Sequence, residues 1–206
     1  MRRTKIKICG ITQKDQALQI GSMEIDAMGF VLYPPSPRFI EPEKLKQIIP
    51  ELPPFLKTIG VFVNESIESL ISIVRKTGLD MVQLSGDETP EYCVALTLKG
   101  ISWIKGIRVE SEIDFHLLNT FNSNYFLLDA WSEKEYGGTG KTLDWDKIKE
   151  RKDSKQIILA GGLKPNNVKE AIQKVRPYAI DVSSGVEIEP GIKSLAKVER
   201  LIQEIV

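Results

Sequence analysis

Two side chains that could move protons stand at the ends of apolar segments. Cys9 closes the alternating run of residues 5–9, and Asp129 closes the apolar run of residues 125–129. A cysteine at the last position of a strand tends to face a cleft, although free cysteine is also a common core residue, so packing is the alternative role for Cys9. Partial burial would raise the pKa of the Asp129 carboxyl. Such a pair suits proton transfers around a carbonyl or imine, and this chemistry requires neither a metal ion nor an organic cofactor.

Two glycine-rich segments in the last third of the chain could hold a phosphate group. Each directly follows a strand-like run, and the candidate residues are Gly161, Gly162, Ser183, Ser184 and Gly185. Backbone N–H groups in such loops, together with serine hydroxyls, donate hydrogen bonds to anions. The alternative is that the glycines only permit tight turns. We therefore expect a phosphorylated small molecule as the ligand.

Eight strand-like runs recur along the chain. They are residues 6–9, 27–33, 56–63, 81–84, 103–109, 125–129, 156–160 and 179–182. Segments with helical spacing lie between them, for example residues 67–74, 168–175 and 195–202. This alternation predicts a parallel sheet covered by helices, and eight repeats allow it to close into a (β/α)8 TIM barrel of the α/β class. The alternative is an open doubly wound sheet, but the turn after the first run has no glycine-rich dinucleotide motif.

The ends of the predicted strands identify a set of candidate site residues. In a (β/α)8 barrel the active residues gather at the C-terminal ends of the strands. These positions are Cys9, Tyr33, Asn64, Ser85, Arg108, Asp129, Gly161 and Ser183. The chain length suits a single catalytic barrel domain, residues 1–206, near the lower size limit of the fold.

Composition narrows the possible partners. Lys and Arg number 28, as do Asp and Glu, and the basic residues are scattered, so we expect no nucleic acid partner. No apolar stretch approaches the roughly 18 residues of a membrane span, which favours a cytoplasmic protein. Two distant cysteines and one histidine, His116, indicate neither a disulfide framework nor a metal site. A monomer and a homodimer are both compatible with the sequence.

Five segments resemble the phosphoribosylanthranilate isomerase family, in the same order along nearly the whole chain. They are residues 7–12 (KICGIT), 29–38 (GFVLYPPSPR), 60–64 (GVFVN), 137–141 (GGTGK) and 181–187 (DVSSGVE). The resemblance implies a (β/α)8 barrel that catalyses an Amadori rearrangement in tryptophan biosynthesis. The substrate would be N-(5-phosphoribosyl)anthranilate and the product 1-(2-carboxyphenylamino)-1-deoxyribulose 5-phosphate.

The resemblance also implies roles for individual residues. Asp129 would be the general acid that protonates the ribose ring oxygen, and Cys9 the general base that removes the proton from sugar carbon 2. Arg38 would face the anthranilate carboxylate, which an arginine can bind bidentately, although a solvated loop arginine is the alternative. Asp181 would lie near the sugar hydroxyls, or would hold the phosphate loop as a buried structural acid.

The main departure from the family pattern is at Ser85, and a lesser one is Ser194, where the family often has aspartate. Residues 83–86 read QLSG, whereas the family usually has histidine where Ser85 stands. We expect the reaction to survive, because the acid and the base lie elsewhere. Any contribution of the histidine to substrate positioning would come from Ser85, from water or from nothing.

Two rival functions remain open at this stage. A histidine-pathway phosphosugar isomerase performs the same rearrangement, but it resembles two matched half-barrels with carboxylates as acid and base. Here the first strand offers Cys9, and only one end of the chain carries a phosphate pattern. A non-catalytic barrel that binds phosphorylated ligands is the second rival, and it would need neither Cys9 nor Asp129.

Overall fold

The computed structural model describes residues 3–109, 115–130, 143–149 and 156–205. The glycine-rich motif of residues 137–141 lies outside these ranges.

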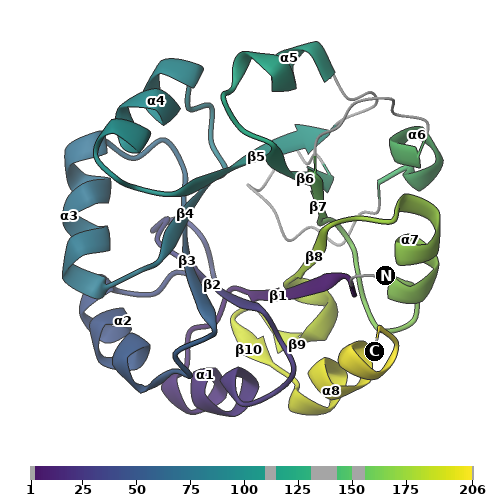
Figure 1. The fold of residues 1–206 in the computed structure, drawn as a ribbon. Coiled ribbons are helices and arrows are strands. Elements are labelled where there is room, and N and C mark those ends of the chain that lie inside the picture. Colours follow the sequence, from purple (N-terminus) through teal and green to yellow (C-terminus); the bar gives the residue numbers. More distant parts are fainter. Residues whose placement is uncertain (1–2, 110–114, 131–142, 150–155, 206) are drawn as a thin grey trace.

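Eight parallel strands close into a barrel in chain order, and helices surround it (Figure 1). The strands are β1 (Lys5–Cys9), β2 (Ala27–Val31), β3 (Lys57–Phe62), β4 (Met81–Leu84), β5 (Trp103–Val109), β6 (Tyr125–Ala130), β7 (Gln156–Leu159) and β8 (Ala179–Val182). Each strand pairs with the next, and β8 pairs with β1, so no barrel strand has an unpaired edge. The predicted (β/α)8 barrel is confirmed.

The predicted runs differ from the observed strands only at their ends. The largest difference is at β2, which ends at Val31 rather than at Tyr33. Ser36 N–H donates to the Tyr33 carbonyl at 2.9 Å, so the chain has already entered a turn at that point. The prolines that follow favour this turn.

Helices follow the strands and cover the outside of the barrel. They are α1 (Lys14–Gly21), α2 (Pro42–Ile48), α3 (Ile67–Thr77), α4 (Pro90–Leu98), α5 (Phe115–Thr120), α6 (Trp145–Lys149), α7 (Val168–Val175) and α8 (Leu195–Gln203). Several begin at local signals: Ser66, Thr89 and Ser194 each accept a hydrogen bond from the backbone N–H three residues later. Between β8 and α8 lie the short 3-10 helix η2 (Ser184–Val186) and a hairpin of β9 (Glu187–Glu189) and β10 (Ile192–Lys193).

The core has two apolar layers with a polar group inside the barrel. The larger layer packs strands against helices, and a smaller cluster that includes Ile59, Ile104 and Leu127 fills part of the interior. Lys7 on β1 donates to the Gln83 side chain on β4 at 2.9 Å. Because β2 and β3 lie between these strands in the barrel wall, this contact crosses the interior. Polar side chains therefore occupy the barrel next to the apolar cluster.

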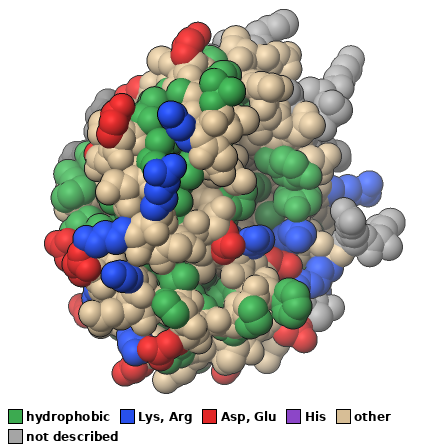
Figure 2. All heavy atoms as spheres, turned by 60° about the vertical axis from the view of Figure 1, so that its left-hand side comes forward, with side chains coloured by type: hydrophobic (Ala, Val, Ile, Leu, Met, Phe, Trp, Pro, Cys, Tyr) green, Lys and Arg blue, Asp and Glu red, His purple; other side chains and the backbone are tan. Residues whose placement is uncertain are grey.

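The surface carries mixed charges. On the face shown in Figure 2, acidic and basic side chains are interspersed among apolar ones. None of the helices in the described ranges combines the length and the apolar character that a membrane span requires.

Candidate active site

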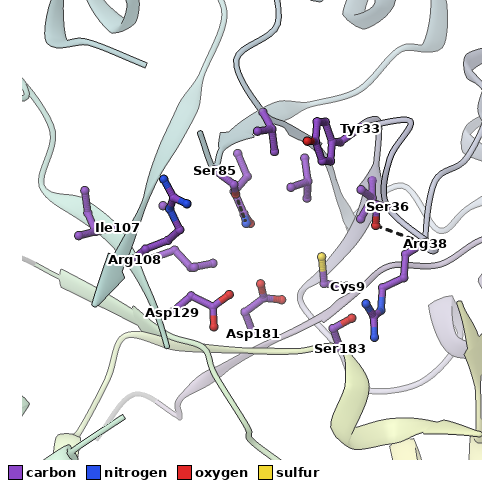
Figure 3. Close-up of a pocket in the computed structure, with 16 residues that line it drawn as sticks. Cys9, Tyr33, Ser36, Arg38, Ser85, Ile107, Arg108, Asp129, Asp181 and Ser183 are labelled. Carbon is purple, nitrogen blue, oxygen red and sulfur yellow. Dashed lines mark hydrogen bonds between the residues drawn. The ribbon is translucent and has the colours of Figure 1, made fainter. Parts of the chain in front are cut away.

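A pocket opens at the carboxyl ends of the barrel strands (Figure 3). Six of the eight strand-end positions nominated by the sequence line it: Cys9, Tyr33, Ser85, Arg108, Asp129 and Ser183. Arg38 and Asp181 line it as well, whereas Asn64 and Gly161 are not among its lining residues. The structure thus brings both predicted catalytic residues and all three predicted substrate-binding residues to one pocket.

The thiol of Cys9 lies over a glycine on the neighbouring strand. Cys9 and Gly29 are register partners on β1 and β2, and a Cβ atom on Gly29 would lie 2.6 Å from Sγ of Cys9. Glycine at position 29 therefore leaves room for the thiol. Burial raises the pKa of Cys9, and the positive charge of Lys7 opposes this rise without cancelling it. The thiol form consequently predominates at neutral pH.

Asp129 has the raised pKa that its position in the sequence predicts. Burial is the largest cause, the negative charge of Asp181 adds to it, and together they raise the pKa of Asp129 to about 6. A backbone hydrogen bond from Ala130 and the charge of Lys7 act in the opposite direction. A carboxyl of this kind can donate a proton closer to neutral pH than an ordinary aspartate can.

A chain of hydrogen-bonded polar side chains, most of them buried, runs from Asp181 to Ser85. Lys7 donates to Asp181 at 2.8 Å and to Gln83 at 2.9 Å, and Gln83 Nε2 donates to the Ser85 hydroxyl at 3.0 Å. The second carboxylate oxygen of Asp181, Oδ1, is buried and accepts no hydrogen bond from the described residues. Lys7 and Gln83 were missed by sequence reasoning, because a lysine that alternates with Ile6 and Ile8 in a strand has the pattern of a solvent-facing residue.

Arg38 is held in a buried ion cluster. Its Nε and Nη2 atoms donate to the two carboxylate oxygens of Glu187 at 3.0 and 2.8 Å, and Lys193 donates to the same carboxylate at 2.6 Å. Arg38 is only 8% exposed, so it is not a solvated loop arginine. Glu187 and Lys193 belong to the β9–β10 hairpin and were not nominated from the sequence.

The two predicted phosphate loops touch each other. A Cβ atom on Gly185 would lie 1.8 Å from the Leu163 carbonyl oxygen, so the loop after β8 packs directly against the loop after β7. Gly161 and Gly162 both have left-handed backbones, with φ of 84° and 62°. Of the five predicted phosphate residues, Ser183 alone is among the lining residues of the pocket, and Ser184 begins η2 beside it.

The described residues contain no group of three or more His, Cys, Asp or Glu side chains arranged to hold a metal ion. The arrangement found is instead two aspartates, a thiol and two arginines around one pocket. This set can transfer protons and bind an anionic ligand.

Known proteins provide an independent comparison. The family model for N-(5'-phosphoribosyl)anthranilate (PRA) isomerase matches residues 6–204. A protein of Citrifermentans bemidjiense named N-(5'-phosphoribosyl)anthranilate isomerase is 46% identical over 201 residues, which are 98% of this chain and 96% of that protein.

Solved structures agree in fold over the same length. The phosphoribosyl anthranilate isomerase of Thermotoga maritima has a TM-score of 0.89 and 40% identity, with 98% of each chain covered. A phosphoribosyl anthranilate isomerase in complex with reduced 1-(o-carboxyphenylamino)-1-deoxyribulose 5-phosphate has a TM-score of 0.84 and 39% identity, again with 98% of each chain covered.

Proposed function

Because the chain belongs to the N-(5'-phosphoribosyl)anthranilate isomerase family, its reaction is an aldose–ketose isomerisation in tryptophan biosynthesis, and we propose that Cys9 and Asp129 carry the proton transfers. The substrate is N-(5-phospho-β-D-ribosyl)anthranilate. The product is 1-(2-carboxyphenylamino)-1-deoxy-D-ribulose 5-phosphate.

Asp129 acts first, as the general acid. It gives its proton to the ribose ring oxygen while the bond between that oxygen and carbon 1 breaks, and the nitrogen lone pair forms the Schiff base. The thiolate of Cys9 then removes the proton from carbon 2, and the electron pair left behind forms the double bond of an enolamine. Loss of the proton from the carbon 2 hydroxyl and protonation of carbon 1 complete the ketone.

The observation that supports this assignment best is that one pocket contains both side chains and shifts the pKa of each. The pKa of Asp129 is raised to about 6, which keeps part of it protonated near neutral pH. The pKa of Cys9 is also raised by burial, but Lys7 provides a positive charge that favours the thiolate. The acid and the base that we propose therefore face the same pocket and share Lys7 and Asp181 as charged neighbours.

Three further residues are proposed to bind the substrate. Asp181 faces the pocket with an oxygen that accepts no hydrogen bond from the described residues, which suits a sugar hydroxyl donor. The Ser85 hydroxyl accepts from Gln83, so its own proton is available to the ligand. Arg38 lines the pocket with its guanidinium orientation fixed by Glu187, and we propose that it contacts the anthranilate carboxylate.

The phosphate is proposed to bind at the paired loops after β7 and β8. Their contact at Gly185 and the left-handed backbones at Gly161 and Gly162 support an anion site built from backbone N–H groups, with Ser183 and Ser184 as added donors. The related structure holding a reduced phosphorylated product analogue fits this class of ligand.

Turnover of freshly generated substrate tests the mechanism. We expect Cys9→Ser and Asp129→Asn each to lower kcat by roughly 10²- to 10⁴-fold with the fold retained. Cys93→Ala is the matched control, because Cys93 is the other buried thiol and packs within α4, so its removal should leave kcat unchanged. Turnover near the wild-type rate in either variant would remove that residue from the mechanism.

We propose that residues 1–206 act as one catalytic domain in the cytoplasm, as a monomer or homodimer, with no nucleic acid partner. Light scattering of the purified protein measures the assembly, and a mass above that of a dimer would contradict this expectation.

A further inference from the structure

A buried ion pair lies beside the turn that follows β4. Lys105 on β5 and Glu88 in the loop after β4 are 2.7 Å apart, and their side chains are 4% and 1% exposed. Neither is among the described residues that line the pocket. Ile104 belongs to the apolar cluster inside the barrel, so the next side chain along β5, that of Lys105, points outwards to the helix layer. The pair therefore lies behind the wall of the pocket.

The ammonium group of Lys105 contacts the backbone on both sides of Ser85. Its Nζ donates to the Gly86 carbonyl at 2.7 Å and to the Leu84 carbonyl at 3.4 Å. Ser85 donates its own backbone N–H to the Phe62 carbonyl on β3 at 2.9 Å. The main chain at Ser85 is thus held by β5 and by β3.

Glu88 holds the same turn through its backbone N–H groups. Its Oε1 atom accepts from Gly86 N–H at 3.2 Å and from Asn64 N–H at 2.9 Å, while Oε2 accepts from Lys105. Asn64 has a left-handed backbone, with φ of 53°, and its Oδ1 atom accepts from the Asp87 N–H at 2.7 Å. One buried carboxylate therefore joins the loop after β3 to the loop after β4.

Two glycines make this arrangement possible. A Cβ atom on Gly86 would lie 2.7 Å from the backbone nitrogen of Asn64, so a side chain does not fit there. A Cβ atom on Gly106 would lie 3.2 Å from the Ser85 hydroxyl oxygen. Glycine next to Lys105 on β5 therefore leaves room for this hydroxyl.

Stability alone does not require charges at this position. Taking two charges out of water costs free energy, and apolar residues of similar volume often stabilise a fold equally well. What the pair of Lys105 and Glu88 adds is a fixed geometry of the backbone groups that it binds. Within this turn Ser85 is the residue that lines the pocket (Figure 3).

We propose that Lys105 and Glu88 are positioning residues, which hold the turn after β4 so that the Ser85 hydroxyl meets the substrate. This inference rests on the proposed function, in which Ser85 donates a hydrogen bond to the substrate. The two residues act through Ser85 and do not touch the substrate themselves. Their removal should therefore weaken substrate binding by way of this hydroxyl.

The proton transfers should not depend on the pair. Within the described part of the chain, none of the charges that shift the pKa of Cys9 or of Asp129 belongs to Lys105 or Glu88. A change in KM with little change in kcat is therefore the signature of the proposed role.

A double-mutant cycle between Lys105 and Ser85 tests this role. KM and kcat are measured with freshly generated substrate for the wild type, Ser85→Ala, Lys105→Met and the double variant. Glu88→Gln, alone and combined with Ser85→Ala, is a milder change that keeps the shape of the side chain and removes its charge. It reports on the pair even if Lys105→Met folds poorly. Leu96→Ala is the control for lost stability, because Leu96 is buried in the last turn of α4, at the opposite end of this helix from the loop.

We expect Ser85→Ala and Lys105→Met each to raise KM by roughly 3- to 10-fold, since each removes the same hydrogen bond to the substrate. Glu88→Gln should raise KM by a smaller factor, and kcat should change by less than about 2-fold in all of these variants. The double variant should have the KM of Ser85→Ala to within about 2-fold, because Lys105 acts through that hydroxyl. Leu96→Ala should leave KM unchanged.

Three results would overturn the inference. Additive increases of KM in the double variant would show that Lys105 affects the pocket independently of Ser85. An equal rise of KM in Leu96→Ala would assign the effect to lost stability. An unchanged KM in Ser85→Ala, or in both Lys105→Met and Glu88→Gln, would leave the pair nothing to position.

The proposed function is judged separately in the same assay. In each of these three cases, turnover by the wild type that is lost in Cys9→Ser would leave the proposed proton transfers standing. Absence of turnover by the folded wild type would overturn the proposed function and the inference with it.

Discussion

Lys7 and Asp181 are register partners across the seam where β8 closes the barrel against β1, and their side chains form an ion pair of 2.8 Å inside it. This pair reaches both catalytic candidates. The charge of Asp181 raises the pKa of Cys9 and of Asp129, and the charge of Lys7 lowers both. Closure of the barrel therefore fixes the electrostatic setting of the acid and the base together.

Removing Lys7 should disturb both pKa values. In Lys7→Met, Asp181 loses its counter-charge, so the pKa of Cys9 should rise further and the free energy of unfolding should fall by about 3–5 kcal/mol. The pH dependence of Cys9 alkylation, measured in a Cys93→Ala background, reports the thiol pKa.

Lys105→Met is the matched control for this experiment. Lys105 and Glu88 form an equally buried pair at 2.7 Å, with side chains 4% and 1% exposed, which does not contribute to the pKa of Cys9. This variant should lose similar stability but keep the alkylation profile. If both lysine variants shift the profile equally, the electrostatic role of Lys7 is wrong.

The plot of kcat/KM against pH should be bell-shaped, and its acidic limb should have its midpoint at the pKa of Asp129. The proposed mechanism requires protonated Asp129 and ionised Cys9. The pKa of Asp129 is about 6, and the pKa of Cys9 is raised above its ordinary value. Between these two pKa values only a small fraction of the enzyme carries both protonated Asp129 and ionised Cys9, and this fraction does not change with pH. The rate should fall below pH 6 and again in the alkaline range. In Asp129→Asn the limb near pH 6 should disappear, and its persistence would assign that limb to another group.

The same pKa shift affects folding stability. The pKa of Asp129 is raised in the folded state from 3.8 to about 6, so the folded protein binds this proton more tightly than the unfolded chain does. Its contribution to stability is full at low pH and is lost as the pH rises towards 6. Asp129→Asn should therefore increase the free energy of unfolding at pH 7, by roughly 1–3 kcal/mol, and most of this gain should be gone at pH 4. Urea titrations at the two pH values measure the difference.

Local patterns predicted the strands and the two catalytic candidates, but they did not predict the ion pairs. A strand end is encoded in a few neighbouring residues, so Cys9 and Asp129 could be placed from their own segments. Lys7 and Asp181 are 174 positions apart, and Arg38 and Glu187 are 149 apart. In addition, when apolar and polar residues alternate along a strand, the polar ones are expected to face the solvent, as Lys5 does. Only closure of the barrel turns Lys7 inward and buries it.

Contact between the two loops that we propose to bind the phosphate can be tested at Gly185. Gly185→Ala would place Cβ 1.8 Å from the Leu163 carbonyl oxygen, so the loops must move apart. We expect KM to rise by at least roughly 10-fold, because the backbone donors to the phosphate lose their arrangement. Gly100→Ala is the control: nothing lies within 4 Å of the Cβ position of Gly100, which differs from Gly185 in having a left-handed backbone with φ of 75°. An unchanged KM in Gly185→Ala would place the phosphate elsewhere.

Arg38 and Glu187 should act as one unit in substrate binding. Arg38→Ala should raise KM by roughly 10- to 100-fold with a smaller effect on kcat, because it removes a binding contact rather than the acid or the base. Glu187→Gln should raise KM in the same direction, since the guanidinium loses the carboxylate that orients it at 2.8 and 3.0 Å. It should also lower the free energy of unfolding by about 3–5 kcal/mol, because Arg38 and Lys193 would remain buried without a counter-charge. The double variant should then raise KM little more than Arg38→Ala alone, whereas additive increases would show that Glu187 acts on the substrate independently of Arg38.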